Sequence, residues 1–160
     1  ISSNGKRLGY SRDICRNSCG DIFVGTHIGL FELDHKSDRF IYINNLSDIY
    51  VESLFVDSGD RIWISTASDG AICYNPADTS YVSYRFSSKD KSLPSDRILS
   101  AYEDKEGDLW FCTFGKGICR LKKSDGTFEI YNSTTLSDSS FHDICHFVLN
   151  DNDGNLWIHC

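Results

Sequence analysis

The sequence predicts an all-β fold made of repeated four-stranded antiparallel sheets. Three observations predict it: a repeat of 40 to 47 residues, short runs rich in aromatic and β-branched residues, and polar turns containing Gly between those runs. Four runs align when the chain is compared with itself, at 22–26, 62–66, 109–113 and 156–160. Each run has an aromatic residue at its second position; these residues are Phe23, Trp63, Trp110 and Trp157.

The second repeat shows how the residues of one repeat divide into strands. Its predicted strands are 50–56, 61–66, 71–74 and 81–86. The connections between them read Asp-Ser-Gly-Asp, Ser-Asp-Gly and Asn-Pro-Ala-Asp, which are residue types that favour tight turns. Tight turns join antiparallel neighbours, so each repeat is expected to form one meander of four strands.

The second strand of each repeat is apolar at nearly every position. Such a strand is typical of a sheet that is covered on both faces. Sheets that recur every 40 to 50 residues and cover one another predict the blades of a β-propeller. We expect blades at about 8–43, 50–86 and 97–132 and a half blade at 141–160, which makes a propeller fragment of about 3.5 blades.

The recurring aromatic residues are expected to be structural. A large ring at a fixed place in each blade fills the wedge between neighbouring blades. Ligand stacking is the alternative role for these four rings. The recurring Gly residues are interpreted as backbone positions that need positive φ.

Composition limits the classes of partner. The chain is 40% hydrophobic and 24% charged, which is typical of a globular protein, and its formal net charge is −7. This charge repels phosphate backbones, so no nucleic-acid partner is expected. No apolar run approaches the roughly 18 to 20 residues that a membrane helix needs. Because the sequence starts at Ile1 and not at Met, we expect it to be an excerpt of a longer protein.

The seven cysteines show no paired spacing of the kind that zinc sites use. Most lie inside apolar strand-like runs, and we expect them to be small buried hydrophobic side chains. A disulfide between Cys112 and Cys119, which flank a predicted hairpin, is the alternative that the spacing leaves open.

The third repeat carries a family resemblance. Residues 93–121, which include Leu-Trp-Phe-Cys-Thr, together with Phe-Glu-Ile-Tyr at 128–131, resemble the two component regulator propeller repeat. Related copies cover nearly the whole chain. The first copy departs from the pattern with Asn17 in place of Asp and Phe23 in place of Trp. The fourth copy ends on Cys160 where the pattern has Thr.

This resemblance implies a sensor from a bacterial hybrid two-component system of the Bacteroidetes type. Such proteins have a periplasmic region of two propellers, a membrane helix, and cytoplasmic kinase, receiver and DNA-binding domains. Their usual signals are oligosaccharides, and their output is transcription of genes for glycan use. The segment is therefore expected to be periplasmic, to sense and not to catalyse, and to need no cofactor.

The same resemblance implies the partners. They are an oligosaccharide ligand, the remaining blades and second propeller of the longer protein, and a second copy in a homodimer of that protein. The longer protein is expected to be an inner-membrane histidine kinase, so the segment would meet the membrane only through it.

The candidate ligand residues lie in loops. In a propeller whose first strand is innermost, the loops from second to third strand and from fourth strand to the next repeat lie on one face, which we call the loop face. Ligands commonly bind there. The predicted ligand residues are His27, Asp69, Asp96, Arg97 and Lys116. Asp96 and Arg97 are suited to binding sugar hydroxyls or carboxylates.

Metal and catalytic motifs are not expected. Asp151-Asn-Asp-Gly-Asn has its Gly at the fourth position of the loop, whereas a calcium loop needs it at the sixth. His142 and His146 are predicted on one innermost strand, where residues four apart lie roughly 13 Å from each other, too far to share a metal. No nucleophile elbow, phosphate loop or dinucleotide motif occurs.

Two other functions remain as alternatives. A propeller lyase or glycosidase would need acidic groups that converge, such as Asp69 with Asp96. A protein-binding scaffold would need a large exposed apolar patch. An incomplete fan of blades also leaves an exposed pairing edge, so we expect self-association where nothing else covers it.

Overall fold

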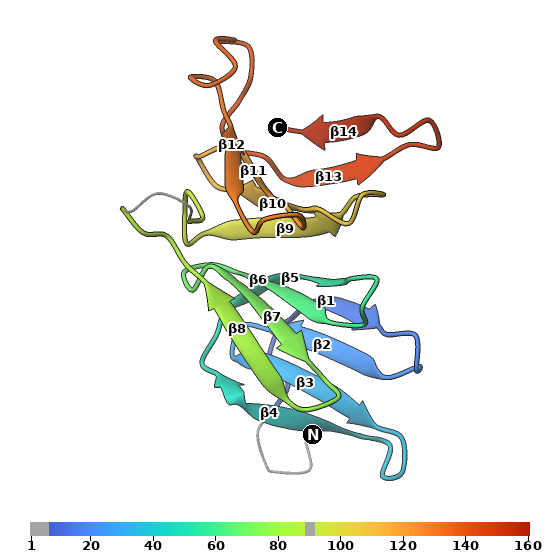
Figure 1. Ribbon diagram of the computed structural model, residues 1–160. Coiled ribbons are helices and arrows are strands. Elements are labelled where there is room, and N and C mark those ends of the chain that lie inside the picture. The colour runs from blue at the N-terminus through green and yellow to red at the C-terminus, as the bar shows by residue number, and fades with distance from the viewer. Residues whose placement is uncertain (1–6, 89–91) are drawn as a thin grey trace.

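The computed structural model describes residues 7–88 and 92–160, and over these residues every regular element is a β-strand. Three four-stranded antiparallel sheets follow one another along the chain, and a two-stranded sheet follows the third (Figure 1). Within each sheet the strands pair in sequence order. The predicted all-β propeller fold of about three and a half blades is confirmed.

The first sheet consists of β1 (Ser11–Arg16), β2 (Ile22–Thr26), β3 (Gly29–Asp34) and β4 (Arg39–Ser47). The second consists of β5 (Val51–Val56), β6 (Ile62–Thr66), β7 (Ala71–Asn75) and β8 (Ser80–Tyr84). The third consists of β9 (Ile98–Glu103), β10 (Leu109–Thr113), β11 (Ile118–Leu121) and β12 (Phe128–Tyr131). The last sheet is the hairpin of β13 (Phe147–Asn150) and β14 (Leu156–His159).

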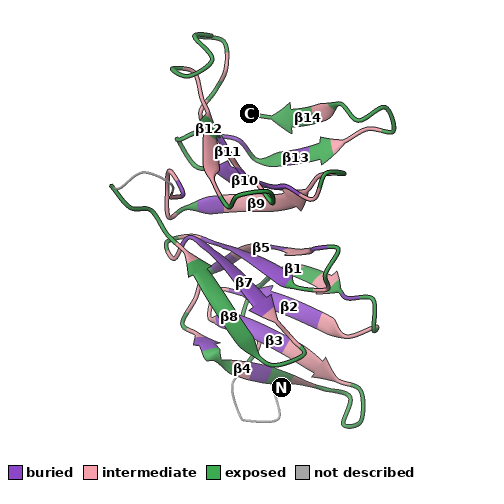
Figure 2. Cartoon of the chain, in the orientation of Figure 1, coloured by how far each residue is buried: buried purple, intermediate pink, exposed green. Residues whose placement is uncertain are grey.

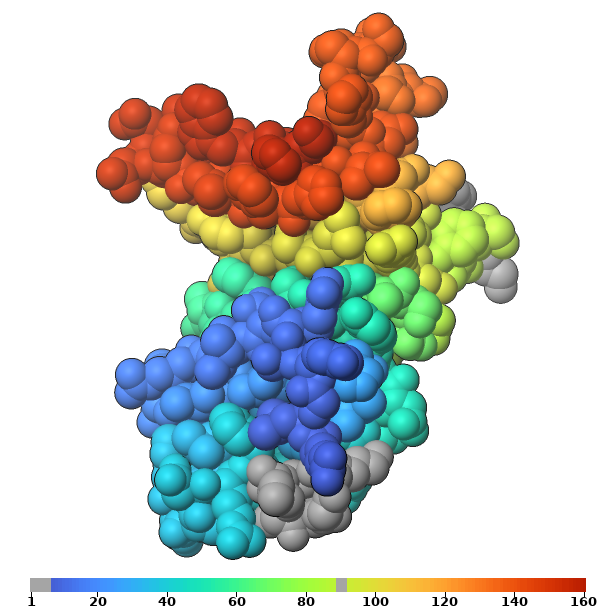
Figure 3. Space-filling model, turned by 180° about the vertical axis from the view of Figure 1, so that it is seen from behind, coloured from blue at the N-terminus to red at the C-terminus, as the bar shows by residue number. Residues whose placement is uncertain are grey.

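The sheets stack through apolar layers. Seen from behind, the blue-to-green atoms of the first two sheets lie at one end of the molecule and the yellow-to-red atoms of the third sheet and the hairpin at the other (Figure 3). The first strands β1, β5, β9 and β13 contact one another from sheet to sheet, as the innermost strands of a propeller do. Strands β6 and β10 are buried at all five of their positions (Figure 2), as expected of strands covered on both faces.

Three of the four recurring aromatic residues lie in these layers. Phe23, Trp63 and Trp110 are 0%, 1% and 9% exposed. Trp157 differs from the expectation of an inter-blade core residue, since it is 60% exposed. It lies on β14, and no strand of the described residues covers that side of the hairpin.

An Asp six residues before each Trp accepts a hydrogen bond from the indole. The Nε1–Oδ2 distances are 2.8 Å for Trp63 and Asp57, 2.7 Å for Trp110 and Asp104, and 2.9 Å for Trp157 and Asp151. The first repeat has Phe at the ring position and therefore no indole donor. Asn17 there bonds Asp21 instead, at 2.9 Å. Asn17 in place of Asp and Phe23 in place of Trp therefore go together, because a Phe ring has no N–H for an Asp carboxylate to accept.

A threonine at the end of each complete second strand fixes the loop that follows. The Oγ1 atoms of Thr26, Thr66 and Thr113 donate to the carbonyl oxygens of Gly29, Gly70 and Gly117 at 2.9, 2.7 and 2.7 Å. All three threonines are buried. In the fourth repeat Cys160 stands at this position and forms a disulfide with Cys145.

The alternative disulfide between Cys112 and Cys119 is wrong, and the pairing register explains it. Cys112 pairs with Ile118, whereas Cys119 pairs with Phe111. Neighbouring positions of a strand point to opposite faces, so the two sulfur atoms lie on opposite sides of the sheet. Both cysteines are free and buried, as is Cys73, while Cys19 is exposed.

The start of the fourth repeat also differs from the expectation. Strand β13 begins at Phe147, so His142 and His146 precede the strand and lie in the loop that leads to it. The distance of roughly 13 Å that an extended strand would impose on them therefore does not apply. Separately, no helix among the described residues is long and apolar enough to cross a membrane.

Candidate ligand site on the loop face

Backbone hydrogen bonds tie the loops of the loop face together. The Phe114 N–H donates to the Arg97 carbonyl at 3.2 Å, and the Gly70 N–H donates to the Asp96 carbonyl at 2.9 Å. Gly70 belongs to the second sheet and Phe114 to the third. The segment before β9 therefore bridges two blades, at the left of Figure 1.

The structure brings two of the predicted residues together through a third. The Arg85 guanidinium contacts Asp69 at 3.1 Å and Asp96 at 3.4 Å. It also donates to the Ser68 carbonyl at 2.9 Å, while Asp96 accepts from the Phe86 N–H at 2.7 Å. The side chains of all three charged residues are one third to one half exposed, so the cluster faces solvent with two carboxylates and one guanidinium.

Arg85 was not predicted. The sequence places it at the end of an outer strand, where an isolated basic residue usually points into solvent. Arg85 lies two residues before the predicted loop that leads to the third repeat. That position is the sequence feature that could have indicated its contact with Asp69 and Asp96. Chemically, the Asp69–Arg85–Asp96 cluster supplies acceptors and donors in one place, an arrangement that suits polyhydroxylated ligands.

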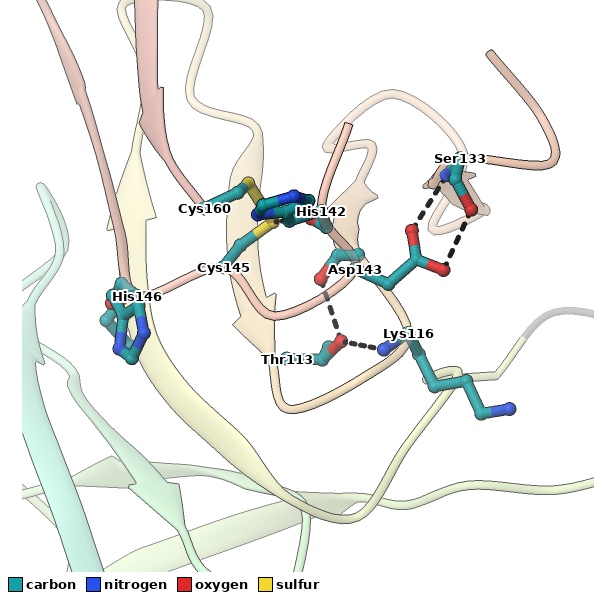
Figure 4. Close-up of a disulfide and its surroundings, with 10 residues drawn as sticks. Thr113, Lys116, Ser133, His142, Asp143, Cys145, His146 and Cys160 are labelled. Carbon is teal, nitrogen blue, oxygen red and sulfur yellow. Dashed lines mark hydrogen bonds between the residues drawn. A yellow bond between two sulfur atoms is a disulfide. The ribbon is translucent and has the colours of Figure 1, made fainter. Parts of the chain in front are cut away.

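Arg97 and Lys116 lie on the neighbouring blade. The Arg97 guanidinium carbon is 3.9 Å from the centroid of the Phe114 ring, a cation–π contact, and Phe114 is 43% exposed. The backbone N–H of Lys116 donates to Thr113 Oγ1 at 3.1 Å, and its ammonium points away from the disulfide (Figure 4). Arg97 follows Asp96 directly in the sequence and so places positive charge beside the cluster of Asp69, Arg85 and Asp96.

His27 lies on the first blade and joins a different contact. Its Nδ1 accepts from the Tyr10 N–H at 3.1 Å, and the two rings lie 5.5 Å apart. No hydrogen bond or ion pair within the described ranges links His27 to the other four predicted residues. The structure therefore brings Asp69 and Asp96 together through Arg85, with Arg97 next to Asp96 in the sequence, and among the described residues shows no such contact for His27 or for Lys116.

An open cavity of about 830 Å³ lies farther along the loop face, beside the disulfide (Figure 4). Its lining includes Ser133, Phe141, His142, Asp143 and Cys160. The Asp143 carboxylate is held by Ser133, whose N–H and Oγ donate at 2.7 and 3.0 Å. These residues were missed because the segment from 141 was expected to be strand, which would not have formed a lined hollow.

Metal ligands do not converge in the part of the chain that the structure describes. No three side chains of His, Cys, Asp or Glu type gather there as a set that could hold an ion. The chemistry available at the loop face is hydrogen bonding, charge and aromatic contact.

Residues 92–115, which cover the end of the bridging segment, β9 and β10, match the family model of the two component regulator propeller. This segment resembles one repeat of a two component regulator propeller. The matched residues include Asp96, Arg97 and Phe114, so the regulator propeller repeat carries part of the loop face. No curated protein matches the sequence.

Solved structures resemble this chain over nearly its whole length. The extracellular domain of a putative hybrid two component system from B. thetaiotaomicron is 25% identical, with a TM-score of 0.82 over 95% of this chain. A virginiamycin B lyase from Staphylococcus aureus is 15% identical with a TM-score of 0.73 over 99% of it, and a streptogramin B lyase is 21% identical with a TM-score of 0.72 over 96%.

The chain spans only part of these proteins. It covers 22% of the two component system domain, 51% of the virginiamycin B lyase and 49% of the streptogramin B lyase. The similarity to the two lyases shows a shared fold, because their identity to this chain is low.

Proposed function

We propose that this chain is a ligand-sensing segment in the extracytoplasmic part of a hybrid two-component sensor, and that its ligands are oligosaccharides. The observation that carries the proposal is the Asp69–Arg85–Asp96 cluster on the loop face of a regulator propeller. The similarity to the extracellular domain of a hybrid two component system supports the extracytoplasmic location.

The side chains of the loop face suit sugars. Carboxylates accept hydrogen bonds from hydroxyl groups and a guanidinium donates to them, so the cluster can bind both kinds of partner on one ring. Phe114 adds an exposed aromatic ring, one face of which lies against Arg97. Sites that bind small ligands combine apolar surface with a few placed polar groups in this way.

A sensor must also change when ligand binds. The segment from 92 to 97 hydrogen-bonds to loops of two blades, through Gly70 and through Phe114. A ligand that binds Asp69 and Asp96 together favours the arrangement in which both blades are joined through this segment. Preferential binding to one arrangement is what shifts a conformational equilibrium. In the longer protein, we propose, the change passes to the second propeller, to a homodimer partner and to a histidine kinase across the inner membrane.

The proposal is tested by isothermal titration calorimetry with a panel of oligosaccharides. The chain would be titrated alone and within the longer protein. We expect saturable binding of one glycan without its cleavage. Arg85→Met should raise the Kd about tenfold or more, because charge-assisted hydrogen bonds contribute about 1.5–3 kcal/mol each. The matched control is Arg39→Met, which removes an exposed arginine from β4.

The other outcomes separate the alternatives. Cleavage of a panel member, followed by product analysis, would replace the sensor with an enzyme that uses Asp69 and Asp96. Absence of binding to every glycan would favour a protein-binding scaffold. Equal binding by the Arg85→Met and wild-type proteins would remove the loop-face cluster from the proposal.

A further inference from the structure

The opposite face of the molecule carries a second cavity, which the proposed function does not use. This face holds the turns from first to second strand and from third to fourth strand, and we call it the turn face. A cavity of about 410 Å³ lies there between the second and third sheets. It is large enough for a small organic molecule.

The cavity combines apolar walls with basic groups. Its apolar lining is Trp63, Tyr84, Leu109 and Leu121, and the rings of Trp63 and Tyr84 lie 5.4 Å apart. Its charged lining is Arg61, Lys122, Lys123 and Glu103. Three cations and one anion therefore surround an apolar hollow in a chain whose overall charge is −7.

Most of these charges have partners within the protein. Glu103 accepts hydrogen bonds from the Ser58 N–H and Oγ at 2.5 and 2.8 Å, which joins the turns of the two sheets. The Arg61 guanidinium contacts Asp57 at 2.7 Å, and the Lys122 ammonium contacts Glu129 at 2.5 Å.

Lys123 is different, because within the described ranges its ammonium makes no ion pair. Its side chain lies against Gly107, where a Cβ atom would be 2.8 Å from Lys123 Nζ. Gly107 has a φ of +83° and no side chain, so the lysine can lie across the turn that borders the cavity. An unpaired cation at the wall of an apolar cavity attracts an anion.

The fold itself does not call for lysine at these positions. The turn between third and fourth strands has Asp34 and His35 in the first sheet and Asn75 and Pro76 in the second, where the third sheet has Lys122 and Lys123. Each turn joins the same pair of strands in the same register. The turn as a structural element therefore does not require the basic pair, which lines the cavity.

We propose that this cavity binds a small organic anion in which a ring carries a carboxylate. The carboxylate would face Lys123, the cation of the lining without an ion-pair partner in the described ranges, and the ring would lie against the apolar wall formed by Tyr84, Leu109 and Leu121. Acidic sugars and aromatic acids share this chemistry. The site is on the face opposite the oligosaccharide site and does not depend on it.

The test is a titration of the ¹⁵N-labelled chain followed by NMR. Glucuronate and benzoate represent the two sources of a ring carboxylate, and glucose is the neutral probe at the same ionic strength. We expect saturable shifts of the Gly59, Gly107 and Gly126 amides with an acid and not with glucose, because these glycines line or border the cavity. Whether glucuronate or benzoate binds more tightly identifies the source.

Variants locate the binding. Lys123→Met should weaken binding about tenfold, the loss expected for one charge-assisted contact. Lys36→Met removes a lysine from the equivalent turn of the first sheet and should leave the affinity unchanged. Lys123→Arg keeps the charge and should keep most of the affinity, which separates loss of charge from disturbance of the turn.

Three results would overturn the proposal. They are no saturable shift at the lining glycines with either acid, equal shifts with glucose, and unchanged affinity in Lys123→Met. None of these results bears on the oligosaccharide site. That site is tested separately, by calorimetry with the Arg85→Met variant on the other face.

Discussion

The hydrogen bond from the Trp indole to an Asp carboxylate recurs in three of the four repeats. It explains why Asp lies six residues before each Trp, a spacing that a turn alone does not need. Burial opposes ionisation of Asp57, but hydrogen bonds from Trp63 and Arg61 outweigh it and lower the pKa of the carboxyl. Hydrogen bonds from Trp157, the largest cause, and from Asn155 and Asp153 lower the pKa of Asp151 to about 2.

Removal of the Asp57 carboxylate should destabilise the protein. Asp57→Ala leaves the buried indole N–H of Trp63 without its acceptor, and we expect a loss of about 2–3 kcal/mol in the free energy of unfolding. Urea denaturation followed by tryptophan fluorescence measures it. Asp151→Ala is the control, and its loss should be much smaller because Trp157 is exposed. Equal losses in both variants would contradict this account.

The same carboxylates predict how stability depends on pH. The pKa of Asp57 and of Asp151 is lower in the folded protein than the ordinary value of 3.8. The unfolded chain therefore binds protons first as the pH falls. The stabilisation is complete well above pH 3.8 and is lost progressively from there towards about pH 2. Acid unfolding curves should show a shallower decline in Asp57→Asn, where the carboxyl that titrates is absent.

At the scale of elements, the strands were predictable and the segments between sheets were not. Strand β6 was predicted to within one residue because its apolar run is bounded by turn residues on both sides. The segment from 141 to 146 was predicted as strand, yet Asp143 is bound by Ser133 and by loop amides, so the chain folds back before β13. Contacts of that kind depend on tertiary structure, and periodicity does not reveal them.

The candidate site also contains some residues whose location the sequence predicts and others whose location it does not. Strand order alone puts the loops of Asp69, Asp96, Arg97 and Lys116 on one face, so their location was predictable, while their role in ligand binding stays a prediction. Arg85 was not predictable, since its role depends on a guanidinium that reaches two carboxylates in different loops. The disulfide of Cys145 with Cys160 was also missed, because a strand interpretation of residues 141–146 placed Cys145 wrongly.

Two glycines of one loop should respond differently to substitution. Gly115 and Gly117 both have positive φ, at +88° and +78°. A Cβ atom on Gly117 would lie 2.1 Å from the Tyr131 carbonyl oxygen, whereas one on Gly115 would meet nothing within 4 Å. Gly115→Ala should cost about 1 kcal/mol for backbone strain, and Gly117→Ala should cost clearly more. Thermal denaturation of the two variants compares them, and equal costs would show that the clash is relieved.

The disulfide should stabilise the hairpin of β13 and β14 more than it stabilises the other sheets. It links residues 15 apart, and closing a loop of that length stabilises a protein by about 3 kcal/mol. Replacing Cys145 and Cys160 by Ala should therefore speed amide hydrogen exchange in β13 and β14, while β6 and β10 stay protected. Faster exchange throughout all sheets would mean that the hairpin is needed for the whole stack.

At the scale of the whole molecule, the stack of sheets ends in an apolar surface. Phe147, Leu149 and Trp157 lie on the outer face of the hairpin and are 48%, 44% and 60% exposed. Leu149 pairs with Trp157 across the two strands, so these side chains share one face, while the neighbouring Val148 is buried against the third sheet. A grouped set of large apolar side chains on a surface favours association.

Self-association through this face should depend on Trp157. Sedimentation velocity of the chain should show a larger species that grows with concentration, and Trp157→Glu should shift it towards monomer by placing a charge in the contact. Tyr81→Glu, on the exposed strand β8, is the control for an added charge elsewhere. Equal association of the two variants would place the contact on another surface.

Pairing in sequence order within every sheet has a consequence for how the molecule forms. Within the described residues, the strands of each sheet come from one stretch of the sequence and pair with their neighbours in sequence order. A polypeptide emerging from its N-terminus, from a ribosome or through a translocation channel, can complete one blade and offer it as a template for the next. Assembly then proceeds in the direction of synthesis, and a blade gained or lost by duplication or deletion leaves the pairing inside every other blade unchanged.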